Sequence, residues 1–487
     1  MKIAGIVALT ALLLLFAVLA FKTVRFKSLQ MKTVPAAALE IPGPAVERLS
    51  QAIRFRTISY EKDQAALADP QAFQAFIDFI DRSFPRVRAG LKKETIGPAG
   101  LLYRWQGKNP DLKHILLMAH SDVVPVAADT EARWTHPPFD GVVADGFIWG
   151  RGTMDDKQSL MGILEAVERL LADGFRPERG VDLAFGCDEE ILGLAGAAQI
   201  ARRLRADGRD YEFILDEGLP IMEGGLPGLT RPVALIGTSE KGYASLNLDV
   251  TMEGGHSSMP AAQTAIGVLG RAISRLEANP CPTRFEGPTR DMFRYVGAEI
   301  PFPQKTIFAN LWLFGKLVLA RMGGLPATSA VVRTTTAPTI IRGGIKDNVL
   351  PASAHGVVNF RILPGDSVAA VVEHARRVIA DERVQISVQD GATEPSPVSL
   401  ADSPAFRVLQ KTAVEVFPDV LVAPGLMVGA TDSRHYIGLS KNIFRFGPDR
   451  MTDEDLKRPH GVNERISEAG YKDGIRFYIR LIRNAAG

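Results

Sequence analysis

The chain has 487 residues, 46% of them hydrophobic and 23% charged, which is enough for about two or three separately packed structural units. Its formal net charge of +2 excludes the strongly basic composition typical of nucleic-acid-binding proteins. The two cysteines, Cys187 and Cys281, form no disulfide framework, and they leave the redox compartment open.

The N-terminal segment is typical of a membrane-spanning helix. Residues 3–21 carry no charge, and a run of this length crosses the hydrocarbon core of a bilayer. We expect residues 1–33 to form an uncleaved anchor, because the apolar run is longer than the core of a usual signal peptide; a long signal peptide is the alternative. More basic residues follow the span than precede it, which by the positive-inside rule favours a cytoplasmic soluble part. The Pro- and Ala-rich residues 34–45 are typical of a tether.

Three short apolar runs end in acidic or imidazole side chains. They are HILLMAHSD at 114–122, VDLAFGCDEE at 181–190 and EFILDEG at 212–218. Such runs are typical of buried strands in a parallel sheet, whose carboxyl ends gather at one edge and hold ligands there. The sequence therefore predicts an α/β fold in which residues 46–242 and 393–487 form one catalytic unit.

The side chains at these strand ends have the chemistry of metal ligands. His120 and Asp122 are two residues apart, so both face one side of a strand, and Asp122 can hold the imidazole in its metal-binding tautomer. Asp155 lies in a Gly-rich turn before a helical pattern of apolar residues. Two Zn²⁺ ions carry four positive charges, which Asp155, Glu190, Asp216 and a shared hydroxide would balance. A buried site for two zinc ions is therefore predicted.

Residues 243–392 form a second unit, inserted into the catalytic one. An alternating stretch, YASLNLDVTMEGG, opens it, and the pattern of strand, helix, two strands, helix and strand indicates a small α/β sandwich. Residues 281–335 are an additional segment within it. That segment either adds to the core of the unit or, by our hypothesis, lines a pocket for an apolar acyl group. Its large aromatic residues are Phe285, Phe293, Phe302, Phe308, Trp312 and Phe314.

Together these motifs resemble one enzyme family. In chain order they are HSD, GRGTMDDK, DEE, DEG, GGHSSMP, DNVLPA, NFRILPGD and HGVNE. The set is similar to the co-catalytic zinc metallopeptidases of the aminoacylase, glutamate carboxypeptidase and desuccinylase family. Within that family it most resembles carboxypeptidase S and the N-fatty-acyl-amino-acid hydrolase/synthase enzymes. The resemblance extends from about residue 44 to the C-terminus. It implies a zinc-exopeptidase-like mixed sheet flanked by helices, with an inserted lid and dimerisation domain.

The resemblance also implies roles for individual residues. His120 and Asp216 would bind one zinc, Glu190 and His460 the other, and Asp155 would bridge them. Glu189 matches the general base, which would take a proton from a water activated by the two metals and return it to the departing amine.

Three further residues match substrate-contacting positions of the family. His256, in GGHSSMP, matches the histidine that stabilises the oxyanion, usually from the partner subunit of a homodimer. Arg361 and Asn348 match positions that hold a substrate carboxylate, a task that suits a guanidinium group. Family members with a similar leader act outside the cytoplasm, and we follow the resemblance in expecting an extracytoplasmic catalytic part.

Several of these residues have an alternative explanation. His256 could be an ordinary loop histidine, Arg361 could pair with a surface acid, and Asn348 could be a turn residue. Asp156 and Lys157 are assigned to the first turn of the following helix and stay outside the predicted site. The run GATDSRHY, residues 429–436, suits either a substrate loop or a turn.

The predicted function is cleavage of an amide bond next to a residue with a free carboxylate. The substrates would be short peptides, as for carboxypeptidase S, or N-acyl amino acids, and the sequence does not choose between them. Two other classes stay open: a membrane-tethered binding protein that has lost catalysis, and a single-metal deacylase. A single metal would not require both Asp155 and Glu190.

Overall fold

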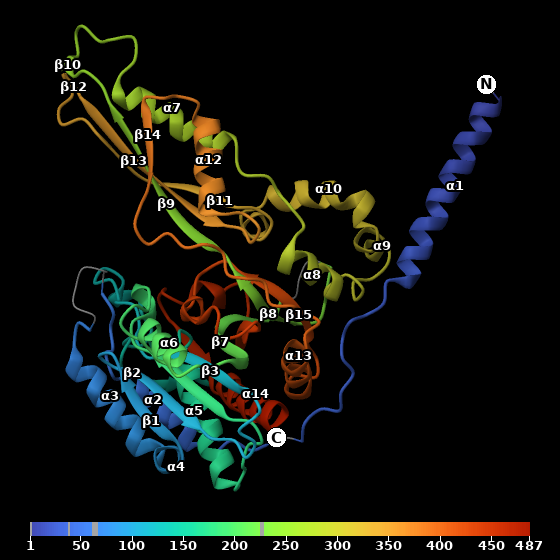
Figure 1. Ribbon diagram of the computed structural model, residues 1–487, viewed down its shortest axis with the longest axis vertical. Coiled ribbons are helices and arrows are strands. Elements are labelled where there is room, and N and C mark those ends of the chain that lie inside the picture. Colours follow the sequence, from blue (N-terminus) through green and yellow to red (C-terminus); the bar gives the residue numbers. More distant parts are fainter. Residues whose placement is uncertain (1, 38, 61–66, 225–227) are drawn as a thin grey trace.

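The computed structural model describes residues 2–37, 39–60, 67–224 and 228–487 (Figure 1). The chain folds into a large lower body built on one sheet and a smaller upper body built on another. A long N-terminal helix, α1 (Lys2–Arg25), projects from the side of the molecule.

In the described residues the larger sheet has eight strands in the order β1-β2-β6-β3-β7-β16-β8-β15. Its central strands β6, β3, β7 and β16 are parallel, and antiparallel pairs on both sides make the sheet mixed. The strands are β1 (Lys92–Ile96), β2 (Gly100–Trp105), β3 (His114–His120), β6 (Val181–Gly186), β7 (Tyr211–Met222), β8 (Val233–Glu240), β15 (Leu421–Met427) and β16 (Ile443–Met451).

Helices cover both faces of this sheet. Because successive side chains of a strand point to opposite faces, Ile115 and Leu117 of β3 join the larger core while Leu116 and Met118 join the smaller one. The larger core packs against α2 (Pro44–Ile53), α3 (Pro70–Ser83), α4 (Pro85–Gly90), α5 (Lys157–Ala172), α13 (Pro404–Val416) and α14 (Glu468–Ala486). The smaller core packs against α6 (Ala197–Ala206). Burial on both faces explains why these strands are continuous apolar runs.

The carboxyl ends of β3 and β6 lie side by side, next to the middle of β7. In the parallel register His120 pairs with Gly186 of β6, and Leu117 pairs with Leu215 of β7. The residues that follow Gly186 and Leu215 are therefore brought to the edge where β3 ends.

The smaller sheet is antiparallel, with the strand order β11-β13-β9-β14. Its strands are β9 (Gly242–Thr251), β11 (Thr335–Gly343), β13 (Ser353–Ile362) and β14 (Val384–Val388). The helices α7 (Ala265–Ala278) and α12 (Val368–Ile379) pack against it around a core of its own. This is the chain order of strands and helices that the sequence predicts. The short pair β10 (Gly255–His256) and β12 (Val349–Leu350) lies at the end of this body that is remote from the larger sheet (Figure 1).

The segment between α7 and β11 forms four helices. They are α8 (Gly287–Val296), α9 (Gln304–Ala309), α10 (Leu311–Gly323) and α11 (Pro326–Ala330). α8 packs on β15 of the larger sheet, and α9 contacts α1. A three-stranded sheet, β17-β5-β4, completes the lower body with β4 (Val143–Ala144), β5 (Phe147–Trp149) and β17 (Arg465–Ser467).

Candidate metal centre and active site

His120 is the buried imidazole at the end of β3. Its Nδ1 lies 3.0 Å from the backbone carbonyl oxygen of Asp122 and 3.3 Å from the Asp122 carboxylate. These contacts leave Nε2 pointing toward Asp155, at 2.9 Å. Asp122 also accepts hydrogen bonds from the backbone N–H groups of Glu189 and Glu190, at 3.1 and 3.2 Å. Asp122 therefore orients the imidazole and also fixes the loop that carries the two glutamates.

Asp155 lies between two imidazole rings. Its Oδ1 is 2.9 Å from His120 Nε2, and its Oδ2 is 3.1 Å from His460 Nε2. The second ring also contacts Glu190, whose Oε2 is 3.1 Å from His460 Nε2. One carboxylate thus has an oxygen for each imidazole, which is the arrangement expected of a residue that bridges two cations.

The loop that carries Asp155 is held by a buried acid from the other end of the chain. Glu464 Oε1 accepts hydrogen bonds from the backbone N–H groups of Gly152, Met154 and Asp155, at 2.8–3.2 Å. Its Oε2 accepts one from Arg151, at 2.5 Å. Glu464 lies four residues after His460, so the same contacts bring the C-terminal part of the chain to the cluster.

Asp216 and Glu217 lie in the middle of β7, and their carboxylates have different contacts. Asp216 Oδ2 accepts a hydrogen bond from the backbone N–H of Ser433, at 2.8 Å, and its Oδ1 accepts one from the backbone N–H of Glu217, at 3.0 Å. Glu217 instead points to the cluster, with Oε1 3.4 Å from His120 Nε2. β7 is irregular at this point, because its register with β16 shifts between Asp216 and Leu219.

Two overlapping groups of side chains in the described residues have the spacing needed to hold an ion. Donor atoms of His120, Asp155 and Glu190 lie within 4.8 Å of one another, and so do those of His120, Asp156 and Glu217. The second group contains Asp156, which the sequence analysis left outside the site.

The electrostatics of the cluster are those of a cation site. The carboxylates of Asp155 and Glu190 raise the pKa of His460 to about 10. Burial, reinforced by the Asp155 carboxylate, raises the pKa of Glu217 to about 8. Burial also raises the pKa of Glu189 well above its usual range, and the Glu217 carboxylate adds to that effect. These shifts indicate more negative charge than the two imidazoles neutralise.

A cavity of about 490 Å³ opens beside this cluster, between the two bodies. From the larger body it is lined by Asp155, Glu189, Glu190, Leu192, Glu217, Met427, Gly429, Ala430, Arg434 and His460. From the smaller body it is lined by Tyr243, Arg361, Gly391 and Thr393. The Arg361 guanidinium lies over the Tyr243 ring, 4.9 Å from its centre. Two arginines thus face a cavity whose floor is the acidic cluster.

Arg434 and Glu217 were missed by the sequence analysis. Arg434 belongs to the run GATDSRHY, for which a substrate loop is one of the two interpretations. Gly429 of that run also lines the cavity. Thr431 of the same run serves the scaffold instead, because its backbone N–H donates to Glu240 at 3.0 Å. The only signal for Glu217 was its place beside Asp216.

His256 and Asn348 lie at the tip of the smaller body, away from this cavity (Figure 1). Both are exposed, and the backbone carbonyl of Asn348 accepts a hydrogen bond from Ser257 N, at 3.2 Å. His256 Nδ1 is 2.8 Å from Ser258 Oγ. The structure brings these two residues to each other and not to the acidic cluster of their own chain.

In the part of the chain that the structure describes, the aromatic segment at 281–335 contributes no side chain to this cavity. Phe285, Phe293 and Phe308 pack on one another instead, with ring centres 5.3 Å apart in both pairs. These contacts match the alternative in which the segment adds to the core of the protein.

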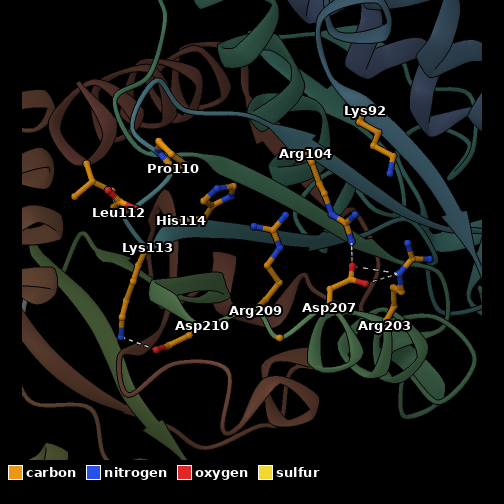
Figure 2. Close-up of a pocket in the computed structure, with 12 residues that line it drawn as sticks. Lys92, Arg104, Pro110, Leu112, Lys113, His114, Arg203, Asp207, Arg209 and Asp210 are labelled. Atoms are coloured by element: carbon orange, nitrogen blue, oxygen red, sulfur yellow. Dashed lines mark hydrogen bonds and ion pairs between the residues drawn. The ribbon is translucent and has the colours of Figure 1, made fainter.

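A second cavity, of about 550 Å³, is lined mainly by basic side chains (Figure 2). Arg104 and Arg203 both contact the carboxylate of Asp207, and Lys113 pairs with Asp210. Because most of its charges are already paired, and because no residue predicted for catalysis lines it, this cavity is not a candidate active site.

Comparison with known proteins identifies the family. The model of peptidase family M20/M25/M40 matches residues 116–484. The chain belongs to this family.

Relatives of this M20 chain match it over most of both sequences. It is 44% identical over 476 residues to the probable carboxypeptidase S-like 2 of Dictyostelium discoideum, covering 96% of this chain and 91% of that protein. It is 43% identical to the N-fatty-acyl-amino acid synthase/hydrolase PM20D1 of Xenopus tropicalis, covering 90% and 85%. It is 33% identical to carboxypeptidase S of Saccharomyces cerevisiae, covering 90% and 84%.

The fold of this M20 chain is that of a solved carboxypeptidase. The crystal structure of an M20 family metallo-carboxypeptidase from Sulfolobus solfataricus superposes with a TM-score of 0.66, covering 91% of this chain and 99% of that one. The two sequences are 17% identical, so this likeness establishes the fold alone. The predicted family, fold class and hydrolase class are confirmed.

Proposed function

We propose that this protein is a membrane-anchored dizinc amidase that removes an amino acid with a free carboxylate from a short peptide or an N-acyl amino acid. The convergence of His120, Asp155, Glu190, Glu217 and His460 at the floor of one cavity, with Arg361 and Arg434 above it, carries this proposal. Such a reaction requires two parts in one cavity, a group of metal-binding side chains and a group that binds the substrate carboxylate.

The donor set fits two zinc ions. His120 and Glu217 would hold one ion, Glu190 and His460 the other, and Asp155 would contact both. Imidazole nitrogen and carboxylate oxygen are ordinary zinc ligands, and three carboxylates with one hydroxide balance the charge of two divalent ions. Glu190 Oε1 is buried without a hydrogen-bond partner among the described residues, which suits an atom that binds a cation. When bound, the metals would lower the pKa of water and polarise the amide carbonyl.

Glu189 would carry the proton during the reaction. It lines the cavity beside Glu190, and both backbone N–H groups are fixed by Asp122. Its carboxylate would accept a proton from the attacking water and donate it to the amine nitrogen as the amide C–N bond breaks. A raised pKa suits a group that must both accept and release a proton near neutral pH.

Arg361 and Arg434 would bind the free carboxylate of the substrate. Each guanidinium can make two parallel hydrogen bonds to a carboxylate, and the two arginines enter the cavity from different bodies of the protein. The names of the relatives support both substrate classes, because they include carboxypeptidase S and N-fatty-acyl-amino acid synthase/hydrolase.

His256 and Asn348 would act on the cavity of a partner subunit. Their common position at the tip of the smaller body removes them from their own cavity, so a homodimer is required if either is to contact substrate. In such a dimer, His256 would stabilise the oxyanion and Asn348 would assist in substrate binding.

The helix α1 would anchor the enzyme, with the catalytic part on the extracytoplasmic side. Residues 3–25 are long and apolar enough to span a membrane, and none of the hydrophobic window is buried in the protein. Protease protection of the full chain in sealed vesicles from the producing cells would determine the side. Digestion of the catalytic part only after the vesicles are opened would support a lumenal, extracytoplasmic site.

A substrate panel with metal analysis tests the central proposal. We expect two equivalents of zinc in protein purified without chelators, and turnover of either a dipeptide panel or N-oleoyl-phenylalanine. Failure on both substrate classes by fully metal-loaded protein would overturn the amidase assignment and favour a binding protein. One equivalent of metal with activity would favour a single-metal deacylase.

A further inference from the structure

The helix α10 presents a row of large apolar side chains to solvent. Trp312, Leu313 and Leu317 are 56%, 43% and 68% exposed. The exposed positions recur as three adjacent pairs, at 312–313, 316–317 and 320–321, which is the spacing of one helical face. We call this surface, formed by Trp312, Leu313, Lys316, Leu317, Ala320 and Arg321, the α10 face.

The α10 face begins beside the C-terminal end of α1. Asn310, at the start of α10, donates hydrogen bonds to the backbone carbonyl of Leu19 and to Thr23 Oγ1, at 3.3 and 3.4 Å. The Lys22 ammonium lies over the Trp312 ring, 5.0 Å from its centre. Trp312 is therefore level with the residues at which the apolar span of α1 ends.

The charges along the chain from α9 to β11 have one sign. No acidic residue occurs between Glu299 and Asp347, whereas Lys305, Lys316 and Arg321 fall in this interval. The end of α1 adds Lys22 and Arg25. Lysine and arginine beside tryptophan and leucine are the composition of helices that lie in the headgroup layer of an anionic bilayer, where basic side chains meet phosphate and apolar ones enter the acyl boundary.

The helices that precede α10 pack on the catalytic body. The stacked rings of Phe293 and Phe308 join α8 to α9, and the Tyr295 hydroxyl of α8 donates to the backbone carbonyl of Ala401 at 2.7 Å. In Figure 1, α10 runs across the direction of α1 and beside the smaller body. A membrane that contains α1 would thus meet α10 along its side.

We propose that the α10 face is a membrane-docking surface that lies in the headgroup layer of an anionic phospholipid bilayer. The proposal rests on α1 being retained as the anchor, which is part of the proposed function. Docking at two points, through α1 and through α10, would hold the catalytic body at a fixed orientation to the membrane instead of letting it turn about a single tether.

Trp312 provides a direct test. The chain has four tryptophans, and the other three, Trp105, Trp134 and Trp149, are buried. The full chain would be reconstituted into vesicles of phosphatidylcholine and phosphatidylglycerol, with and without lipid brominated near the headgroup. We expect bromine to quench the Trp312 emission by roughly half or more, as for an interfacial tryptophan. The signal assigned to Trp312 is the difference between the unmodified chain and Trp312→Phe.

Three outcomes would overturn the proposal, and they differ from failure of the proposed catalysis. If the full chain does not float with the vesicles, α1 is not a retained anchor. If it floats but Trp312→Phe and the unmodified chain are quenched equally, α1 is an anchor and the α10 face does not touch lipid. Emission of Trp312 that instead changes with protein concentration, and not with bromine, would assign this face to a second copy of the chain.

Charge substitutions supply matched controls. Leu313→Glu with Leu317→Glu should abolish the bromine-dependent quenching, because two carboxylates repel anionic headgroups. Val143→Glu, on an exposed position of β4 in the lower body, should leave it unchanged. Turnover of a water-soluble amide substrate should be unaltered in both variants, which shows that they fold. Unchanged quenching in the double variant would contradict docking through this face.

Discussion

Asp216 and Glu217 are adjacent in β7, and their carboxylates have different partners. Asp216 accepts a hydrogen bond from the Ser433 backbone, whereas the Glu217 carboxylate lies 3.4 Å from His120. The role of Asp216 as a metal ligand stays a prediction, and we propose Glu217 as a second candidate, which has the same charge and preserves the charge balance.

The different contacts of Asp216 and Glu217 predict different effects when each residue is substituted. Glu217→Gln should lower the zinc bound to the purified protein toward one equivalent, because a carboxylate ligand of one ion is lost. Asp216→Asn should keep both metals and lower the melting temperature instead, because it weakens a buried hydrogen bond. Inductively coupled plasma mass spectrometry and thermal unfolding, run on both variants, test this. Loss of zinc in Asp216→Asn alone would restore the original assignment.

Glu189 is predicted to act in the reaction and not in metal binding. Glu189→Gln keeps the shape of the side chain but cannot take a proton, so we expect kcat to fall by about 100- to 10,000-fold with unchanged zinc content. Steady-state kinetics with metal analysis measure both. A variant with near-normal kcat would exclude Glu189 as the base.

Asp122 is predicted to act through His120. Asp122→Asn should weaken zinc binding by roughly 10- to 100-fold, because the orientation of the imidazole and of the loop at Glu189 both depend on this carboxylate. Titration with a competing chelator gives the affinity. Saturating zinc should recover much of the activity, which distinguishes a positioning role from that of Glu189.

If His256 acts in the cavity of the partner subunit, two variants that are inactive alone should restore activity when they are mixed. Glu189→Gln and His256→Ala should each be nearly inactive alone. Mixed in equal amounts with subunit exchange, they should reach about one quarter of normal activity, because half of the dimers are mixed and each has one intact site. Mass spectrometry under native conditions verifies the exchange. Mixed dimers without activity would argue that His256 serves its own chain or none.

The buried carboxyl of Asp449, which is not among the predicted metal ligands, should make the folding stability depend on pH. Burial raises its pKa to about 7, although Gln158 donates a hydrogen bond to it. As pH rises from about 4 to 7, the unfolded chain releases this proton and the folded chain keeps it, so folding stability falls, by up to about 4 kcal/mol above pH 7.

Asp449→Asn removes this group and should raise the melting temperature more at pH 8 than at pH 5.5. Scanning calorimetry at both pH values measures the difference. The exposed Asp453→Asn is the control and should change the melting temperature equally at both. A pH-independent effect of Asp449→Asn would show that Asp449 ionises normally in the folded chain.

The sequence is sufficient to predict the strands β3 and β6 and the residues at which they end. β3 and β6 are apolar on both faces because helices cover both, so their runs were visible in composition alone, and the polar residues that follow them were read correctly as the edge of the sheet. His120, Asp155 and Glu190 could be selected as candidates because each lies where an apolar run ends or in a Gly-rich turn, whereas the role of His460 followed from the family resemblance.

The direction in which each side chain points depends on contacts that form only in the folded chain. A strand buried on both faces has no alternation of polar and apolar residues, so its sequence does not reveal whether Asp216 or Glu217 points to the cluster. The same holds for His256, whose distance from the cavity follows from the pairing of β10 with β12, and for α10, whose apolar residues could equally have formed a core. Contacts between segments far apart in the chain fix these directions, and a local pattern of residues does not contain them.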